Sequence, residues 1–213
     1  FPYATVRFSL SNVICAPSIS FFVAGLLVWN LFSDEGKDGT FKNAVSHGLS
    51  RRDLFLGKCL VSTALGLICL AAFLVVFVGS ALALLEGPGL EATGTLLQGI
   101  GAALPFTVAC AVLAVAVCAT LPTSWAGFVA WGAVVFFVPM LLDNIGRFLE
   151  PVAALAAWMP ANFFSSGVLI NQSGAAEFLW STPWGLAKCL VTGFAGIAAF
   201  GAWGLWRAEK TEL

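Results

Sequence analysis

The chain has 213 residues, of which 60% are hydrophobic and only 10% charged, and its mean hydropathy is +0.95. Soluble domains carry about 25% charged residues, so this composition excludes a soluble globule. The net charge of −1 provides no basic surface for nucleic acid, and we expect no nucleic-acid partner.

The apolar stretches are long enough to cross a membrane, which takes about 20 residues in a helix. The stretch 92–142 is uncharged over 51 residues, and as one helix it would extend about 75 Å, far beyond a hydrocarbon core of about 30 Å. It must therefore fold back, and Leu121-Pro122-Thr123-Ser124 is a suitable turn. The sequence predicts an all-α membrane protein with a single transmembrane domain over 1–213. Its five spans lie at 12–32, 59–85, 95–121, 124–142 and 184–206.

The basic residues predict the orientation of these spans. The loop 33–58 holds five of the ten Lys and Arg residues, whereas 86–91 holds none and 143–183 holds only Arg147. Because cytoplasmic loops carry the excess of Lys and Arg, we expect loop 33–58 and the C-terminus to be cytoplasmic and the other two connections external.

Two short helices are predicted within loop 33–58. Thr40 can cap a helix that starts at Phe41 and ends at Gly48. Ser50 can cap the next helix, with Asp53 completing an approximate capping box, and this helix is predicted to run without a break into the span 59–85. The polar side of the first helix could bind a partner, although an ordinary solvated loop explains the pattern equally well.

The external stretch 143–183 is apolar but interrupted by prolines. Pro151 suits the first turn of a helix that reaches Trp158, and Pro160 would stop it. We expect short helices that dip into the outer leaflet or lie on it, and we interpret the aromatic residues as membrane anchors rather than a ligand site. These aromatic residues are Trp158, Phe163, Phe164, Trp180 and Trp184.

Small residues predict close helix contacts, since they let helix backbones approach each other in lipid. They recur at helical spacing in two of the spans. The pairs and rows are Gly99 with Ala103, Cys110 with Ala114 and Cys118, Gly193 with Ile197, and Ala198 with Ala202.

The spans lack the residues that most membrane chemistry requires. They contain no Asp, Glu, Arg or His, and Lys188 lies near the outer end of its span, where its ammonium can reach the interface. Ion-coupled transport needs ionisable groups inside the membrane. The six cysteines have no metal-binding spacing, and there is no phosphate-binding loop. We expect no catalytic, cofactor or metal site on this chain, so energy for uphill transport would come from another protein.

The loop also contains a motif. It reads Glu35-Gly36-Lys37-Asp38-Gly39-Thr40-Phe41-Lys42-Asn43, then Ser46-His47-Gly48-Leu49-Ser50-Arg51-Arg52, and Lys58. These residues closely resemble the first cytoplasmic loop of ABC-2 type transporter permeases. The match is closest to the small six-helix permeases of bacitracin and lantibiotic export or immunity systems. The order of apolar stretches is similar throughout.

This resemblance implies a permease subunit in a bacterial plasma membrane, with a sixth span expected before Phe1. Its partners would be a second or sister permease, surrounding lipid and two cytosolic ATPase subunits that hold ATP and Mg. The loop would carry the coupling helix, the element that contacts the ATPase, with Lys42, Arg51 and Arg52 as polar contacts. The expected contact residues are Gly39, Thr40, Phe41, Lys42, Asn43, Val45, His47, Gly48, Ser50, Arg51 and Arg52.

Two alternatives remain at this point. One is a non-transporting immunity or assembly factor that binds a peptide and needs no ATPase. The other is a secondary transporter, which the lack of ionisable residues in the spans disfavours. An apolar lining would suit a hydrophobic or amphipathic cargo such as a peptide, drug or lipid.

Overall fold

The computed structural model describes residues 22–23, 25–30, 50–84, 89–121, 123–165, 168–170 and 176–210. Within these residues four helices are long and apolar enough to cross a membrane. They are α5 (Arg51–Leu84), α6 (Gly89–Thr120), the helix Ser124–Gly146 and α11 (Pro183–Lys210). Most of the first predicted span, 12–32, lies outside the described residues, and its described positions are helical.

Helix α5 begins at Arg51, well before the apolar stretch 59–85 from which this span was predicted. Ser50 Oγ accepts a hydrogen bond from the Asp53 amide at 3.1 Å and donates one to the Asp53 carboxylate at 2.6 Å. The predicted cap at Ser50 is therefore confirmed. The helix then continues for 34 residues, about 51 Å, which is longer than a hydrocarbon core of about 30 Å.

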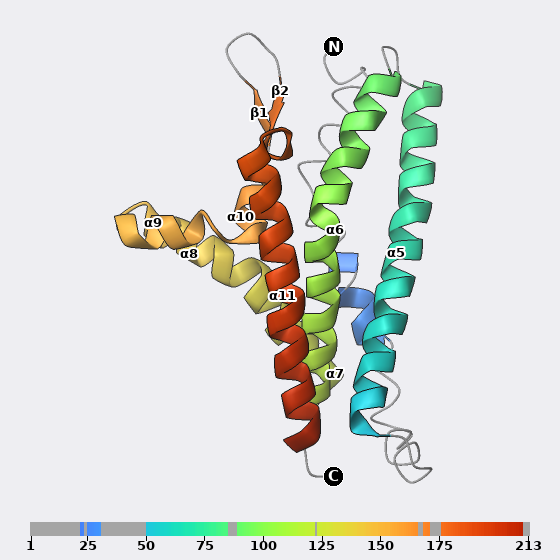
Figure 1. Ribbon diagram of the computed structural model, residues 1–213, viewed down its shortest axis with the longest axis vertical. Coiled ribbons are helices and arrows are strands. Elements are labelled where there is room, and N and C mark those ends of the chain that lie inside the picture. The colour runs from blue at the N-terminus through green and yellow to red at the C-terminus, as the bar shows by residue number, and fades with distance from the viewer. Residues whose placement is uncertain are drawn as a thin grey trace.

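The three longest helices lie side by side along the long axis of the molecule, with α6 in contact with both α5 and α11 (Figure 1). The predicted turn between 95–121 and 124–142 is confirmed, because α6 ends at Thr120 and Thr123 caps α7 (Ser124–Gly132) by accepting from the Ala126 amide at 3.2 Å. The start of α5, this turn and the end of α11 therefore share one end of the bundle (Figure 1).

A π-helical turn, η2 (Ala133–Phe137), follows α7 and precedes Pro139. Proline has no N–H to donate and its ring collides with the carbonyl four residues earlier, so a widened turn accommodates it. Within that turn the Val138 amide donates to the Ala133 carbonyl. Beyond it, α8 (Val138–Gly146) and α9 (Glu150–Ala156) project sideways from the bundle (Figure 1). We call α8 and α9 the lateral arm.

The rest of the segment 143–183 returns the chain to α11. The helix predicted after Pro151 is confirmed as α9, and Pro160 not only follows it but also begins α10 (Pro160–Ser165). Two short strands, β1 (Val168–Ile170) and β2 (Ala176–Phe178), then pair in antiparallel register, and the turn η3 (Leu179–Ser181) leads into α11.

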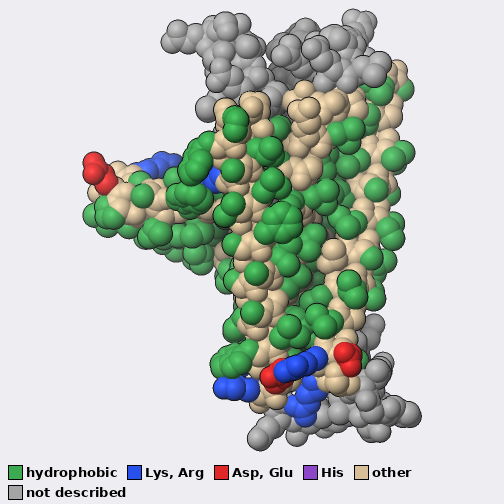
Figure 2. All heavy atoms as spheres, in the orientation of Figure 1, with side chains coloured by type: hydrophobic (Ala, Val, Ile, Leu, Met, Phe, Trp, Pro, Cys, Tyr) green, Lys and Arg blue, Asp and Glu red, His purple; other side chains and the backbone are tan. Residues whose placement is uncertain are grey.

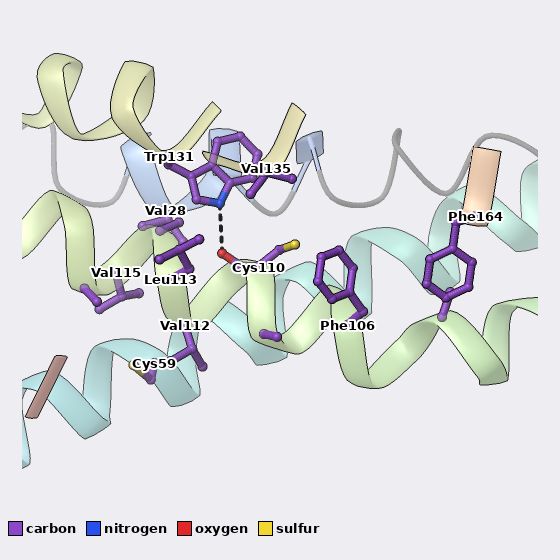
Figure 3. Close-up of a cluster of buried hydrophobic side chains, with 14 of the residues drawn as sticks. Val28, Cys59, Phe106, Cys110, Val112, Leu113, Val115, Trp131, Val135 and Phe164 are labelled. Atoms are coloured by element: carbon purple, nitrogen blue, oxygen red, sulfur yellow. Dashed lines mark hydrogen bonds between the residues drawn. The ribbon is translucent and has the colours of Figure 1, made fainter. Parts of the chain in front are cut away.

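The hydrophobic core is centred on α6, in which every residue from 109 to 118 is buried. Trp131 of α7 is also buried, and its indole N–H donates to the Cys110 carbonyl at 3.0 Å (Figure 3). Gly193 of α11 packs so closely that an added Cβ would lie 2.5 Å from Pro105 Cβ. The predicted helix contacts are confirmed for the row that starts at Cys110 and for Gly193, whereas Ala198 and Ala202 are exposed.

Candidate functional site at the charged end of the bundle

Charged side chains of α5 and α11 gather at one end of the bundle (Figure 2). This is the end at which the predicted coupling loop 33–58 enters α5. The charged residues come from the first turn of α5 and the last turn of α11. They are Arg51, Arg52, Asp53, Arg207, Glu209 and Lys210.

An ion pair joins these two helix ends directly. Arg52 Nε donates to Glu209 Oε1 across 157 positions of sequence, and the two side chains remain 66% and 43% exposed. Exposed ion pairs contribute only about 0–1 kcal/mol to stability. This pair therefore shows that the two helix ends are neighbours, but it does little to hold them together. It places a predicted ATPase contact residue beside the C-terminal end of α11.

A buried contact holds the same helix ends together more firmly. The Phe55 ring, 5% exposed, packs on Gly204 of α11, where any Cβ would collide with it and lie 3.0 Å from Ala116 Cβ of α6. One aromatic ring thus joins α5, α6 and α11. Removing such a side chain costs about 3–5 kcal/mol in a packed core, several times the value of the ion pair. We call this contact the Phe55 joint.

The structure places three of the predicted contact residues. Ser50 caps α5, Arg51 is half-buried in its first turn, and Arg52 pairs with Glu209. The other predicted contacts lie outside the described residues. These are Gly39, Thr40, Phe41, Lys42, Asn43, Val45, His47 and Gly48.

Two residues of this site were missed by the sequence-based prediction, namely Phe55 and Glu209. Phe55 begins the buried face of α5, and Cys59 and Ser62 continue it at helical spacing. That periodicity was the available signal for Phe55. No comparable signal identifies Glu209, since an acid in a charged last turn has many possible partners.

A second polar contact ties the lateral arm to α11. Lys188 Nζ donates to the Ala157 carbonyl at the C-terminal end of α9, and it lies 4.7 Å from the ring centroid of Phe163 and 5.2 Å from that of Trp158. A cation is favourable both at a helix C-terminus and over an aromatic face. The ammonium predicted to reach the membrane interface therefore has protein partners.

The aromatic residues that the sequence predicts as membrane anchors divide into two groups. Trp158 and Trp184 are exposed and meet edge to face at 6.3 Å, which leaves them available as anchors. Phe163, Phe164 and Trp180 are buried, and the Phe164 ring lies 6.4 Å from that of Phe106 in α6. The prediction of membrane anchors is wrong for these three residues, because their side chains are part of the buried hydrophobic core.

No family model, curated protein or solved structure matches the chain. The resemblance to ABC-2 permeases therefore depends on the loop motif and on the order of apolar stretches. Among the described residues, no group of three or more His, Cys, Asp or Glu side chains could hold a metal ion.

Proposed function

We propose that the chain is the permease subunit of an ATP-binding cassette transporter of the ABC-2 type. It would export a hydrophobic or amphipathic compound, such as a peptide antibiotic, a drug or a lipid, with ATP hydrolysed on a separate subunit. The observation that carries the proposal is the motif from Glu35 to Lys58, whose last residues form the first turns of α5.

The contacts of α5 supply a physical path for the coupling. The helix is long and continuous, and its first turns are joined to α11 by the Arg52–Glu209 pair and to both α6 and α11 by the Phe55 joint. A force applied to the loop would therefore move the ends of three helices together. In the proposed mechanism, ATP binding draws the partner ATPases together, the loop acts as a lever, and the helices transmit the shift to the far side of the membrane.

The same contacts determine how the proposal should be tested. A simple Arg52→Glu change would break the intrachain pair and also reverse the charge offered to a partner, so its effect would have two explanations. A swap variant, Arg52→Glu with Glu209→Arg, restores the intrachain pair while the charge at position 52 stays reversed.

We expect the wild-type chain, purified in mild detergent, to retain an ATPase subunit, and Arg51→Glu to weaken this association. Arg52→Glu and the swap variant should weaken it equally if Arg52 contacts the ATPase. Recovery of association in the swap variant would instead give Arg52 a purely intrachain role. The matched control is Arg147→Glu on the lateral arm, which should retain the ATPase.

The proposal as a whole is tested by reconstitution in vesicles. Transport should require the ATPase subunit and ATP. If the chain binds a peptide without any ATPase and moves nothing, it is an immunity or assembly factor; if it drives uphill transport alone, it is a secondary transporter. Either result would refute the permease assignment.

A further inference from the structure

The lateral arm is almost entirely uncovered by the described residues. Of the residues in α8 and α9, only Pro139 and Ala156 are buried, and both lie at the base of the arm. Most of its large exposed side chains are apolar, and Phe148 at the tip is 87% exposed. An exposed apolar surface of this kind marks a contact with a membrane or a partner. It includes Met140, Leu141, Ile145, Phe148, Leu149 and Leu155.

The arm also carries charge, and its charged and apolar side chains lie on different edges. Arg147 Nη2 lies 3.7 Å from Asp143 Oδ2 in an exposed pair, and Glu150 is exposed where α9 begins. Figure 2 shows the visible charged side chains at the tip and along the upper edge of the arm, whereas hydrophobic side chains cover its lower edge. The arm is therefore amphipathic as a whole, and its apolar edge faces toward the charged end of the bundle.

The base of the arm is held by a side chain of the helix that follows it. Asn162 Nδ2 of α10 donates to the Pro139 carbonyl at 2.9 Å and to the Ala156 carbonyl at 3.1 Å, so one amide joins the start of α8 to the end of α9. Nearer the tip, Gly146 packs on α9, where an added Cβ would lie 2.8 Å from Ala153 Cα. The arm is therefore a closed helical hairpin, and its height along the bundle is set by the point at which its base is attached.

That point lies about one membrane thickness from the charged end of α11. Lys188, which bonds the end of α9, stands 19 positions before Arg207, and the residues between them carry no charge. In a helix this separation is about 28 Å, close to a hydrocarbon core of about 30 Å. The ammonium of Lys188 lies over Trp158, and at the opposite end that of Lys210 lies over Trp206. Tryptophan rings gather at membrane interfaces and lysine side chains reach toward them, so the two levels fit the two surfaces of one membrane.

The boundary between acyl chains and headgroups is the layer of a membrane that suits such an arm. At the centre of the hydrocarbon, each charged side chain disfavours insertion about 100-fold. In water, each large apolar side chain would forgo a preference for burial of about 10- to 100-fold. A helical segment that is apolar on one side and charged on the other satisfies both groups at the boundary between these layers.

We propose that the lateral arm binds the lipid surface of the leaflet opposite the charged end, where it lies flat in the headgroup region. Its apolar edge rests on the acyl chains, and Asp143, Arg147 and Glu150 lie among the headgroups. The sequence left open whether the segment 143–183 dips into a leaflet or lies on it, and this placement selects the second arrangement for α8 and α9. It does not depend on the proposed transport function.

The depth of the arm's tip tests this placement. A fluorescent amino acid, acridonylalanine, replaces Phe148, and the purified chain is reconstituted in phosphatidylcholine vesicles. The lipids carry a nitroxide quencher either near the headgroup end of the acyl chain or near its methyl end. Because the apolar face of an interfacial segment lies about 5–10 Å below the headgroups, we expect the shallow quencher to be roughly twofold more effective than the deep one.

Phe194 on α11 provides the matched control. It is a phenylalanine that is 60% exposed, and it lies six positions beyond Lys188, toward the middle of the uncharged stretch. The same amino acid at position 194 should be quenched more by the deep nitroxide than by the shallow one. The two variants carry the same probe, so a difference between them reports depth.

Two results of this experiment would overturn the proposal. Stronger quenching by the deep nitroxide at position 148 would show that the arm dips into the hydrocarbon. Quenching by aqueous iodide, with no effect of either lipid quencher, would show that the arm stands in water.

A photocrosslinking variant distinguishes lipid from a second copy of the chain. Benzoylphenylalanine in place of Phe148 should, on illumination in the same vesicles, give an adduct heavier by one phospholipid, detected by mass spectrometry. A covalent dimer of the chain in place of this adduct would show that a second copy covers the arm, and the proposed lipid contact would then be wrong.

Discussion

Helices α5 and α6 are adjacent, antiparallel and both apolar enough to cross a membrane, but they differ in what surrounds them. In the most apolar stretch of α6, 78% of the residues are buried within the protein, against 6% in α5. The C-terminal third of α6 reads ACAVLAVAVC over residues 109–118, whereas α5 carries large side chains such as Leu60, Ile68 and Val75 that are mostly exposed. Hydropathy alone therefore does not show which helix is central.

The difference follows from the physics of packing in lipid. Lipid tails are as apolar as leucine, so burying a leucine against another helix gains little, whereas small residues allow helix backbones to approach closely. Small side chains thus make α6 the axis of the bundle. The large side chains of α5 remain exposed on the surface of the described part of the chain.

The largest effect of a single added methyl group is expected where α11 approaches α6 most closely. Gly193→Ala would place a methyl group 2.5 Å from Pro105 Cβ and 2.8 Å from the Phe106 amide nitrogen, so the helix backbones must separate. We expect the free energy of unfolding to fall by about 2–3 kcal/mol, measured by thermal or denaturant unfolding in detergent.

Gly201→Ala is the control for this change on the same helix, because no atom of the described residues lies within 4 Å of its added methyl group. It should be stabilising by about 0.5–1 kcal/mol through helix propensity. If both substitutions stabilise the protein, close packing around α6 is not what holds the bundle together.

The hydrogen bond from Trp131 to α6 should have the next largest effect. Trp131→Phe removes the N–H that donates to the Cys110 carbonyl and leaves a gap in the core, so we expect a loss of about 1–2 kcal/mol. Trp125→Phe, one turn and a half earlier and mostly exposed, should cost less than about 0.5 kcal/mol. Equal losses would indicate that aromatic packing and not the hydrogen bond joins α7 to α6.

A smaller and more local effect is expected at the lateral arm. Lys188→Met keeps most of the side-chain volume but removes the donor to the Ala157 carbonyl and the cation over Trp158 and Phe163. We expect the free energy of local opening of α9 to fall by about 1 kcal/mol, so that amide hydrogen exchange in α9 accelerates about fivefold. Exchange in α6 should stay unchanged. Lys210→Met, whose ammonium lies over Trp206 at the opposite end of α11, should leave exchange in α9 unaltered.

The smallest effect should come from the exposed face of α5. Val75→Ala in the isolated chain should change stability by less than about 0.5 kcal/mol, since the side chain is 73% exposed. Phe55→Ala on the same helix should cost about 3–5 kcal/mol. A large loss for Val75→Ala would show that another chain covers this face of α5 in the purified protein.

The sequence predicted the helical elements well because their signals are local. Length and apolar composition indicated the long helices, Ser50 with Asp53 marked the start of α5, and the turn predicted over 121–124 separates α6 from α7. Pro151 likewise placed α9. Each of these signals acts within one turn of a helix, so it can be read without knowing any tertiary contact.

The tertiary contacts were predicted less well. Phe163, Phe164 and Trp180 were expected at the membrane surface but are buried, since an aromatic side chain has the same local pattern in either place. The pairing of Arg52 with Glu209 and the contact of Phe55 with Gly204 join positions about 150 residues apart, and no spacing rule reaches that far.

The sequence by itself determined that this is a helical chain with membrane-length apolar segments, one loop that holds half of its Lys and Arg residues, and no Asp, Glu, Arg or His within the predicted spans. Only the tertiary structure decided that α6 is the axis, that an arm leaves the bundle after Pro139, and that the ends of α5 and α11 meet. The physical reason is that hydropathy measures transfer out of water, whereas the choice among apolar partners depends on shape, close approach and a few hydrogen bonds.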